Sequence, residues 1–227
     1  MSENSIVEIK KIAILGGTGK EGKGLAYRWA KAGIEVVIGS RVLEKAEAAA
    51  IDLNAKLALN GCYVSGMINE EAAAWCDLAV LTVPFTAHLS VLESVKNHLD
   101  GKILIDVTVP LIPPKITKVQ LPSAGSAAQE AQNFLGESVK VVSAFQNISY
   151  ERLINDEEVD CDVIVCGTGK DARAVVIDLV KKAGMVGWDG GVIENSAVTE
   201  GLTSILLGLN KQFEGKAAGI KITGIPR

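Results

Sequence analysis

The sequence predicts an α/β protein: a Rossmann-like, doubly wound parallel sheet with a small C-terminal helical extension. Short apolar runs alternate along the chain with segments of helical periodicity, which is the pattern of successive βαβ units. A glycine-rich stretch, residues 16–26 (GGTGKEGKGLA), lies between the first apolar run and the first helical segment. The 227 residues are 48% hydrophobic and 22% charged, so the chain can bury a sizeable core.

The apolar runs predict the strands. Each run is short and rich in valine, isoleucine or leucine, as buried parallel strands are. The predicted strands cover residues 10–16, 35–39, 77–83, 102–107, 139–144, 162–166 and 185–188.

The helical segments lie between these runs. In the first of them Leu25, Ala26, Trp29 and Ala30 share one face, and Gly33 then ends the helix. The predicted helices cover residues 22–32, about 41–59, 70–75, about 86–98, about 124–134, 171–183 and about 194–212. After residue 190 the chain is one long helix and a glycine-dotted tail. We therefore expect a Rossmann-like, cofactor-binding domain over residues 1–190 and the helical extension over residues 191–227.

Composition excludes several classes of protein. The formal net charge of −4 leaves no basic excess to neutralise nucleic-acid phosphates. The first ten residues are mixed and polar, and charges interrupt every apolar run, so we expect a cytoplasmic protein without a membrane partner. We expect no metal site, because the few cysteines and histidines lack ligand spacing. These residues are Cys62, Cys76, Cys161, Cys166, His88 and His98.

The glycine-rich stretch fits two phosphate-binding templates. Residues 17–23 match the loop of nucleoside triphosphatases, but Gly24 stands where that loop needs a Mg²⁺-binding hydroxyl. Gly17, Gly19 and Gly22 match G-x-G-x-x-G, the dinucleotide-binding fingerprint, and they follow a predicted strand and open a predicted helix. The second template therefore agrees with its structural context, and the first does not.

The end of the second predicted strand indicates which dinucleotide binds. NAD-specific folds place an acidic residue there to bind the ribose 2′-hydroxyl. This chain has Ser40 and Arg41 instead, with Lys45 one helical turn later. A hydroxyl and two cations can hold a 2′-phosphate, the guanidinium in bidentate fashion, so the sequence predicts NADP.

Three stretches resemble the F420-dependent NADP oxidoreductases: residues 14–26 (ILGGTGKEGKGLA), 36–48 (VVIGSRVLEKAEA) and 76–85 (CDLAVLTVPF). The resemblance implies hydride transfer between NADPH and the deazaflavin coenzyme F420, a small-molecule second substrate. It implies that Thr18, Gly19, Lys20 and Glu21 line the pyrophosphate and the adenosine ribose. It also implies cofactor-lining positions at Phe85, Leu89, Leu111 and Tyr150.

Direct hydride transfer requires little of the protein beyond holding two rings together, so no catalytic residue is predicted. Residues at predicted strand ends are expected to position the rings: Pro84, Phe85, Val109, Pro110 and Ile148. F420 carries a phosphodiester and a carboxylate tail, which basic residues of the extension can bind: Lys211, Lys216, Lys221 and Arg227.

Two alternatives stay open at this stage. One is an NADP-dependent reductase of another carbonyl or imine, with Tyr150, His88 or Lys170 as proton donor. The other is a non-enzymatic NADPH sensor, because Rossmann folds serve many functions. Residues 199–210 (TEGLTSILLGLN) are apolar on more than one helical face, so we also expect a homodimer.

Overall fold

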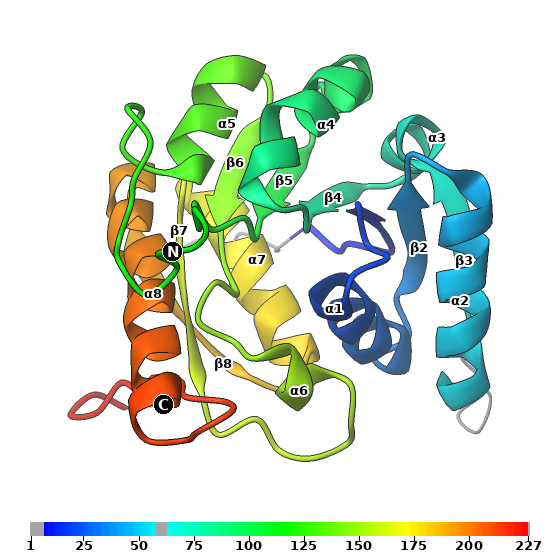
Figure 1. The fold of residues 1–227 in the computed structure, drawn as a ribbon. Helices are drawn as coiled ribbons and strands as arrows, with labels where there is room; N and C mark the ends of the chain where they lie inside the picture. The colour runs from blue at the N-terminus through cyan, green and yellow to red at the C-terminus, as the bar shows by residue number, and fades with distance from the viewer. Residues whose placement is uncertain (1–6, 58–62, 227) are drawn as a thin grey trace.

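The computed structural model describes residues 7–57 and 63–226, in which eight strands form one mostly parallel sheet (Figure 1). The order across the sheet is β3-β2-β1-β4-β5-β6-β7-β8, and the predicted Rossmann-like fold class is confirmed. The strands are β1 (Lys11–Leu15), β2 (Glu35–Ser40), β3 (Val64–Ile68), β4 (Leu78–Leu81), β5 (Ile103–Asp106), β6 (Lys140–Ser143), β7 (Asp162–Gly167) and β8 (Val186–Gly191).

The strand order reverses at β1. The chain moves outward from β1 through β2 to β3, and then returns to place β4 on the other side of β1. In register, Ile14 of β1 pairs with Ile38 of β2 and with Val80 of β4. The loops that leave these three strands therefore begin at one edge of the sheet, where open α/β sheets bind their ligands.

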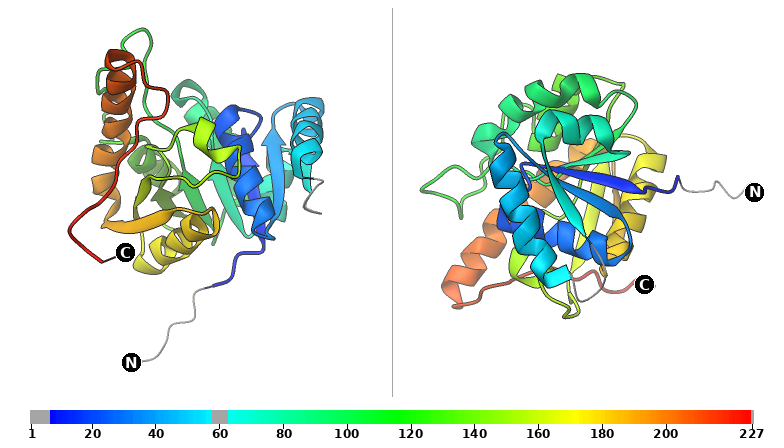
Figure 2. Two further views of the ribbon diagram at one scale, coloured as in Figure 1. Left: turned by 90° about the horizontal axis from the view of Figure 1, so that it is seen from below. Right: turned by 90° about the vertical axis from the view of Figure 1, so that its right-hand side faces the viewer.

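Helices cover both faces of the sheet (Figures 1 and 2). Ile12 and Ile14 pack with apolar side chains of α1, α2 and α7, whereas Ala13 and Leu15 pack with those of α3, α4 and α5. This alternation is the two-residue period of a strand buried on both faces. The α-helices are α1 (Lys20–Lys31), α2 (Leu43–Leu57), α3 (Asn69–Trp75), α4 (His88–Val95), α5 (Ala127–Leu135), α6 (Tyr150–Leu153), α7 (Lys170–Lys182) and α8 (Ser196–Gln212).

One pair of strands departs from the all-parallel arrangement, since β7 runs antiparallel to β6. A parallel neighbour requires a crossover connection of a dozen or more residues, usually a helix packed on the sheet. Here residues 144–161 contain a single short helix, α6, which lies against α1 instead (Figure 1). Without a crossover helix the chain re-enters the sheet from the edge at which it left.

Two elements have little sequence signal. The edge strand β3 reads VSGMI, in which a serine and a glycine interrupt the apolar run. Gly66 is required there, because a Cβ atom would lie 2.5 Å from the carbonyl carbon of Ala46 in α2. The four-residue α6 is too short for a periodic pattern. The last part of the predicted helix over residues 41–59, and Cys62, lie outside the described residues.

The C-terminal segment packs on the rest of the molecule. The side-chain oxygens of Glu200 in α8 accept hydrogen bonds from the backbone N–H groups of Ala127 (2.7 Å) and Ala128 (3.0 Å) at the start of α5. Further on, the carbonyl of Ile220 accepts a hydrogen bond from the N–H of Asp162 at the start of β7. The predicted division at residue 190 falls near the end of β8. Of the helices in residues 7–57 and 63–226, none has the length and apolar character to span a membrane.

Candidate active site

The turn between β1 and α1 is held by backbone contacts that only glycine allows. Gly16 has a φ of 67°, and its N–H donates to the Asn69 side-chain oxygen at 3.1 Å. The N–H of Gly17 donates to the carbonyl of Ile14 at 3.1 Å. A Cβ atom on Gly22 would lie 2.6 Å from the Cα of Gly17. The first and third glycines of the motif are therefore needed for close packing of strand, turn and helix.

The middle glycine of the motif has a different environment. Gly19 is the N-cap residue of α1, and a Cβ atom there would meet no atom of the described chain within 4 Å. No side chain of the described residues caps the helix, so its first N–H groups are available to an anion. Thr18 is half-buried beside it, and Lys20 is exposed. This arrangement fits a pyrophosphate at the start of α1.

A cationic pair lies at the end of the neighbouring strand. Ser40 is buried, and its hydroxyl accepts a hydrogen bond from the N–H of Val42 at 3.2 Å. Arg41 and Lys45 are exposed, and within the described part of the chain neither forms an ion pair. Cations at the start of a helix, here α2, are disfavoured by the helix dipole. A bound phosphate would offset that cost.

A mainly apolar cavity of about 380 Å³, here named the strand-end cavity, opens beside the turn. It is formed by the segments that follow β4 and β5. Of the predicted residues, Pro84, Phe85 and Leu111 line it, whereas Leu89 is 44% exposed on α4 and is not part of its wall. The full lining is Glu21, Thr82, Val83, Pro84, Phe85, Val107, Thr108, Val109, Leu111, Pro113 and Ile116. Its size and apolar walls suit an aromatic ring such as nicotinamide.

A buried polar network supports the β5 side of this cavity. Asp106 accepts a hydrogen bond from the N–H of Thr108 at 2.9 Å and lies 2.7 Å from Nε2 of His88. Nδ1 of His88 lies 3.2 Å from Glu130. Burial lowers the pKa of His88, but the bonds to Asp106 and Glu130 outweigh it and leave the pKa raised. His88 is fully enclosed, so it is a structural residue and cannot reach a substrate as the proton donor of the carbonyl-reductase alternative.

A second cavity, here named the α8-side cavity, lies between α8 and the segment that leads into α6. Its volume is about 170 Å³, and Tyr150 and Lys216 are on its wall. Ile148, predicted to position a ring, also lines it. Val109 lies in the strand-end cavity, and Pro110 is buried between neighbouring wall residues. The full lining is Glu21, Gln146, Asn147, Ile148, Ser149, Tyr150, Thr203, Leu206, Leu207, Asn210, Lys216 and Ala218.

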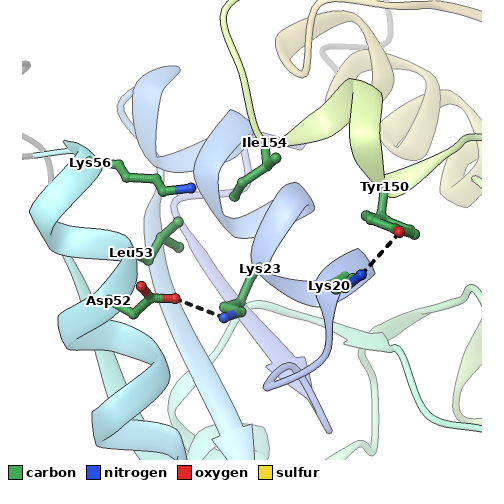
Figure 3. A pocket seen from close by; sticks show the side chains of 7 residues that line it. All are labelled: Lys20, Lys23, Asp52, Leu53, Lys56, Tyr150 and Ile154. Atoms are coloured by element: carbon green, nitrogen blue, oxygen red, sulfur yellow. Dashed lines mark hydrogen bonds and ion pairs between the residues drawn. The ribbon is translucent and has the colours of Figure 1, made fainter.

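Helix α6 is fixed to α1. The ammonium group of Lys20 donates to the hydroxyl of Tyr150 at 3.0 Å, and the ring of that tyrosine lies 4.5 Å from the ammonium group (Figure 3). Arg28, two turns along α1, donates to the backbone carbonyls of Arg152 (2.7 Å), Leu153 (3.0 Å) and Glu157 (2.9 Å). Lys20 and Tyr150, which both belong to the predicted site, are therefore in direct contact.

Three enclosed polar atoms in these cavities have no hydrogen-bond partner among the described residues. They are Oε1 of Glu21, the hydroxyl of Thr108 and Oε1 of Gln146. Enclosed polar atoms usually have partners, so unpaired ones at a cavity wall indicate the position of a ligand's polar groups. Thr108 is not among the residues that the sequence predicts for the site. A threonine beside β5 gives no signal until the fold places it at the cavity.

The predicted site residues thus lie along one edge of the sheet. The glycine motif with Thr18, Lys20 and Glu21 follows β1, and the group of Ser40, Arg41 and Lys45 follows β2. Pro84 and Phe85 follow β4, and Leu111 follows β5. The open phosphate turn, the cationic pair and the apolar cavity with its unpaired hydroxyl together fit a phosphorylated dinucleotide. The described residues contain no group of three or more metal-ligating side chains.

Comparison with known proteins agrees with this geometry. Residues 11–110 match the family model described as NADP oxidoreductase coenzyme F420-dependent. The F420-dependent NADP reductase of Methanocaldococcus jannaschii is 43% identical over 222 residues, covering 95% of this chain and 99% of that protein. The F420-dependent NADP reductase of Methanothermobacter thermautotrophicus (strain Delta H) is 40% identical, covering 97% of each chain.

Among solved structures, an Arthrobacter sp. FB24 protein assigned by name to the F420-dependent NADP-reductases has the same fold. Its TM-score is 0.78 at 24% identity, and the match covers 96% of this chain and 100% of that one. At this identity the likeness supports the fold alone. The near full-length matches at 40–43% identity carry the assignment, and the chain belongs to the F420-dependent NADP reductase family.

Proposed function

We propose that this protein catalyses hydride transfer between NADPH and coenzyme F420. The observation that carries the proposal is a pair of cavities that meet at Glu21 in the first turn of α1, in a chain whose relatives are F420-dependent NADP reductases. A hydride passes directly between two rings, so the protein's main tasks are to bind both and to exclude water.

In this proposal the cofactor follows the sheet edge from β2 to β5. Ser40, Arg41 and Lys45 hold the 2′-phosphate. The backbone N–H groups of the motif Gly17–Gly22, those of Thr18, Gly19, Lys20 and Glu21 among them, hold the pyrophosphate at the start of α1. The nicotinamide enters the strand-end cavity against Pro84, Phe85 and Leu111, with Leu89 and Tyr150 as outer contacts. The apolar walls of the strand-end cavity and the unpaired hydroxyl of Thr108 support this placement of the nicotinamide.

The α8-side cavity is the proposed place for the second substrate. Of the basic residues expected to hold the anionic tail of F420, Lys216 is on its wall, and Lys221 is engaged in an ion pair with Asp160. Lys211 is exposed near the end of α8, and Arg227 lies outside the described residues. Lys216 is therefore the first candidate for contact with the tail.

The decisive experiment is reduction of F420. When the purified protein is mixed with NADPH and oxidised F420, we expect the absorbance of the deazaflavin to decay with turnover. NADH at the same concentration should support a much slower decay, because it lacks the 2′-phosphate. Carbonyl and imine substrates tested in parallel should not be reduced. Turnover of one of these compounds in the absence of F420 reduction would contradict the proposal, as would tight NADPH binding without any turnover.

We also propose that the protein is a cytoplasmic homodimer that assembles through α8. Val198, Ile205 and Leu209 form a stripe along this helix, with exposed fractions of 74%, 53% and 41%, and Phe213 follows at 70%. Their spacing places them on one helical face, which is costly to leave in water. Cys76, Cys161 and Cys166 are free thiols, which agrees with a reducing compartment.

The dimer can be tested by mass. Light scattering at micromolar concentration should give twice the mass of one chain. Ile205→Glu places a charge in the stripe and should yield the mass of a single chain. Lys211→Glu, an exposed change on the same helix, serves as control and should leave the dimer intact. A single-chain mass for the unmodified protein would exclude this assembly.

A further inference from the structure

One carboxyl group lies where the two cavities meet. Glu21 is the second residue of α1, and it lines both the strand-end cavity and the α8-side cavity, which share no other residue. One of its oxygens is completely enclosed and has no hydrogen-bond partner in residues 7–57 and 63–226. A group in this place faces the nicotinamide on one side and the second substrate on the other, if the proposed function holds.

The surroundings of Glu21 favour its neutral form. The neighbouring lysines of α1 are directed elsewhere: Lys20 bonds to Tyr150, and Lys23 bonds to Asp52 at 2.8 Å (Figure 3). Across the α8-side cavity the titratable groups are Tyr150 of α6 and Lys216 beyond α8, and the strand-end cavity has none besides Glu21 itself. Burial raises the pKa of Glu21 to about 8. This shift favours the protonated carboxylic acid at neutral pH, and the enclosed, unpaired oxygen agrees with it.

The reaction consumes a proton, which such an acid can supply. NADPH gives up a hydride, that is, two electrons with one hydrogen nucleus, and becomes NADP⁺. Reduction of the deazaflavin consumes that hydride and one further proton. A positioned side chain whose pKa lies near the working pH is the usual source of a proton of this kind.

We propose that Glu21 is the proton donor of the hydride-transfer site. Its O–H bond breaks as the reduced deazaflavin takes the proton, and water later reprotonates the carboxylate. In the reverse direction the carboxylate accepts the proton as a base. The position in the first turn of α1 favours the anion that remains after donation. The inference rests on the proposed function, because F420 supplies the acceptor.

The test compares wild type with Glu21→Gln, which keeps the shape of the side chain and removes the transferable proton. In single-turnover mixing, the wild-type rate of F420 reduction should be constant below neutrality and fall as the pH rises through about 8. The variant should be about tenfold slower at pH 7 or more, and its rate should not fall over this range. Its Kd for NADPH should stay within about threefold of wild type, since the loss concerns proton transfer. Glu93→Gln, at an exposed position on α4, is the matched control and should behave as wild type.

A readout without substrates separates this inference from the proposed function. Carboxyl ¹³C resonances of labelled glutamates should include two that titrate near pH 8, from Glu21 and from the buried Glu200. Glu21→Gln should remove one of the two. A wild-type pH profile in the variant, loss of NADPH affinity in it, or titration of Glu21 near its ordinary pKa would overturn the inference while leaving F420 reduction in place. Absence of F420 reduction by wild type would overturn both.

Discussion

Replacement of Gly19 by alanine is expected to weaken NADPH binding by roughly 100-fold or more. The added methyl group occupies the space through which the pyrophosphate approaches α1. It therefore displaces charge-assisted backbone hydrogen bonds worth about 1.5–3 kcal/mol each. The fold should survive, since a Cβ atom at this position meets no atom of the described chain within 4 Å. Fluorescence titration with NADPH measures the affinity, and urea denaturation measures the free energy of unfolding.

Gly22→Ala is the matched comparison. Its Cβ atom would lie 2.6 Å from the Cα and 2.8 Å from the carbonyl oxygen of Gly17, so the turn itself must shift. We expect this variant to lose stability as well as affinity. If Gly19→Ala bound NADPH as tightly as wild type, the pyrophosphate would have to lie elsewhere, and the proposed direction of the cofactor would be wrong.

Replacement of Arg41 by alanine should weaken NADPH binding about 10- to 150-fold, the range given by one charge-assisted hydrogen bond of roughly 1.5–3 kcal/mol. Arg41 has no ion-pair partner in the part of the chain that the structure describes, so its removal should not affect the free energy of unfolding. NADH binding should barely change, because NADH has no 2′-phosphate for the guanidinium to hold.

Lys181→Ala is the control for the loss of one positive charge. Lys181 is exposed on α7, outside the predicted cofactor site, so this variant should bind NADPH and NADH as wild type does. Equal losses of NADPH and NADH affinity in Arg41→Ala would mean that the side chain has a structural role and does not determine the choice of cofactor.

The sequence predicted the core of this fold because its strongest patterns are local. The apolar runs before Gly16 and Gly39 and the glycine motif between them specify a βαβ unit within thirty or so residues. The direction of β7 depends instead on how residues 144–161 connect β6 to β7. The absence of a crossover helix between two strands leaves no periodic apolar pattern in the sequence. The edge strand β3 depends on its pairing with β2 and on the close approach of α2 at Gly66.

The residues of the candidate site likewise include some that the sequence predicted and some that only the fold reveals. Gly19 and Arg41 were predicted because the residues next to them in the sequence complete a recognisable motif. Thr108 and the bond between His88 and Asp106 join segments far apart in the chain, so they become visible only when β5 and α4 are in place. Glu21 belongs to both groups. Its position was predicted from the motif, but the enclosure of its carboxyl oxygen between two cavities was not.

The attachment of α6 to α1 bears on how the substrates meet. Many two-substrate enzymes bring their reactants together by closing one lobe over another about a hinge. Here Arg28 holds three backbone carbonyls at and after α6, and Gly24 lets Leu153 pack directly on α1, where a Cβ atom would lie 2.5 Å from it. Rotation of α6 away from α1 would break these contacts. We therefore expect the fold itself to set the distance between the reacting rings, with no separation of lobes as the substrates enter and leave.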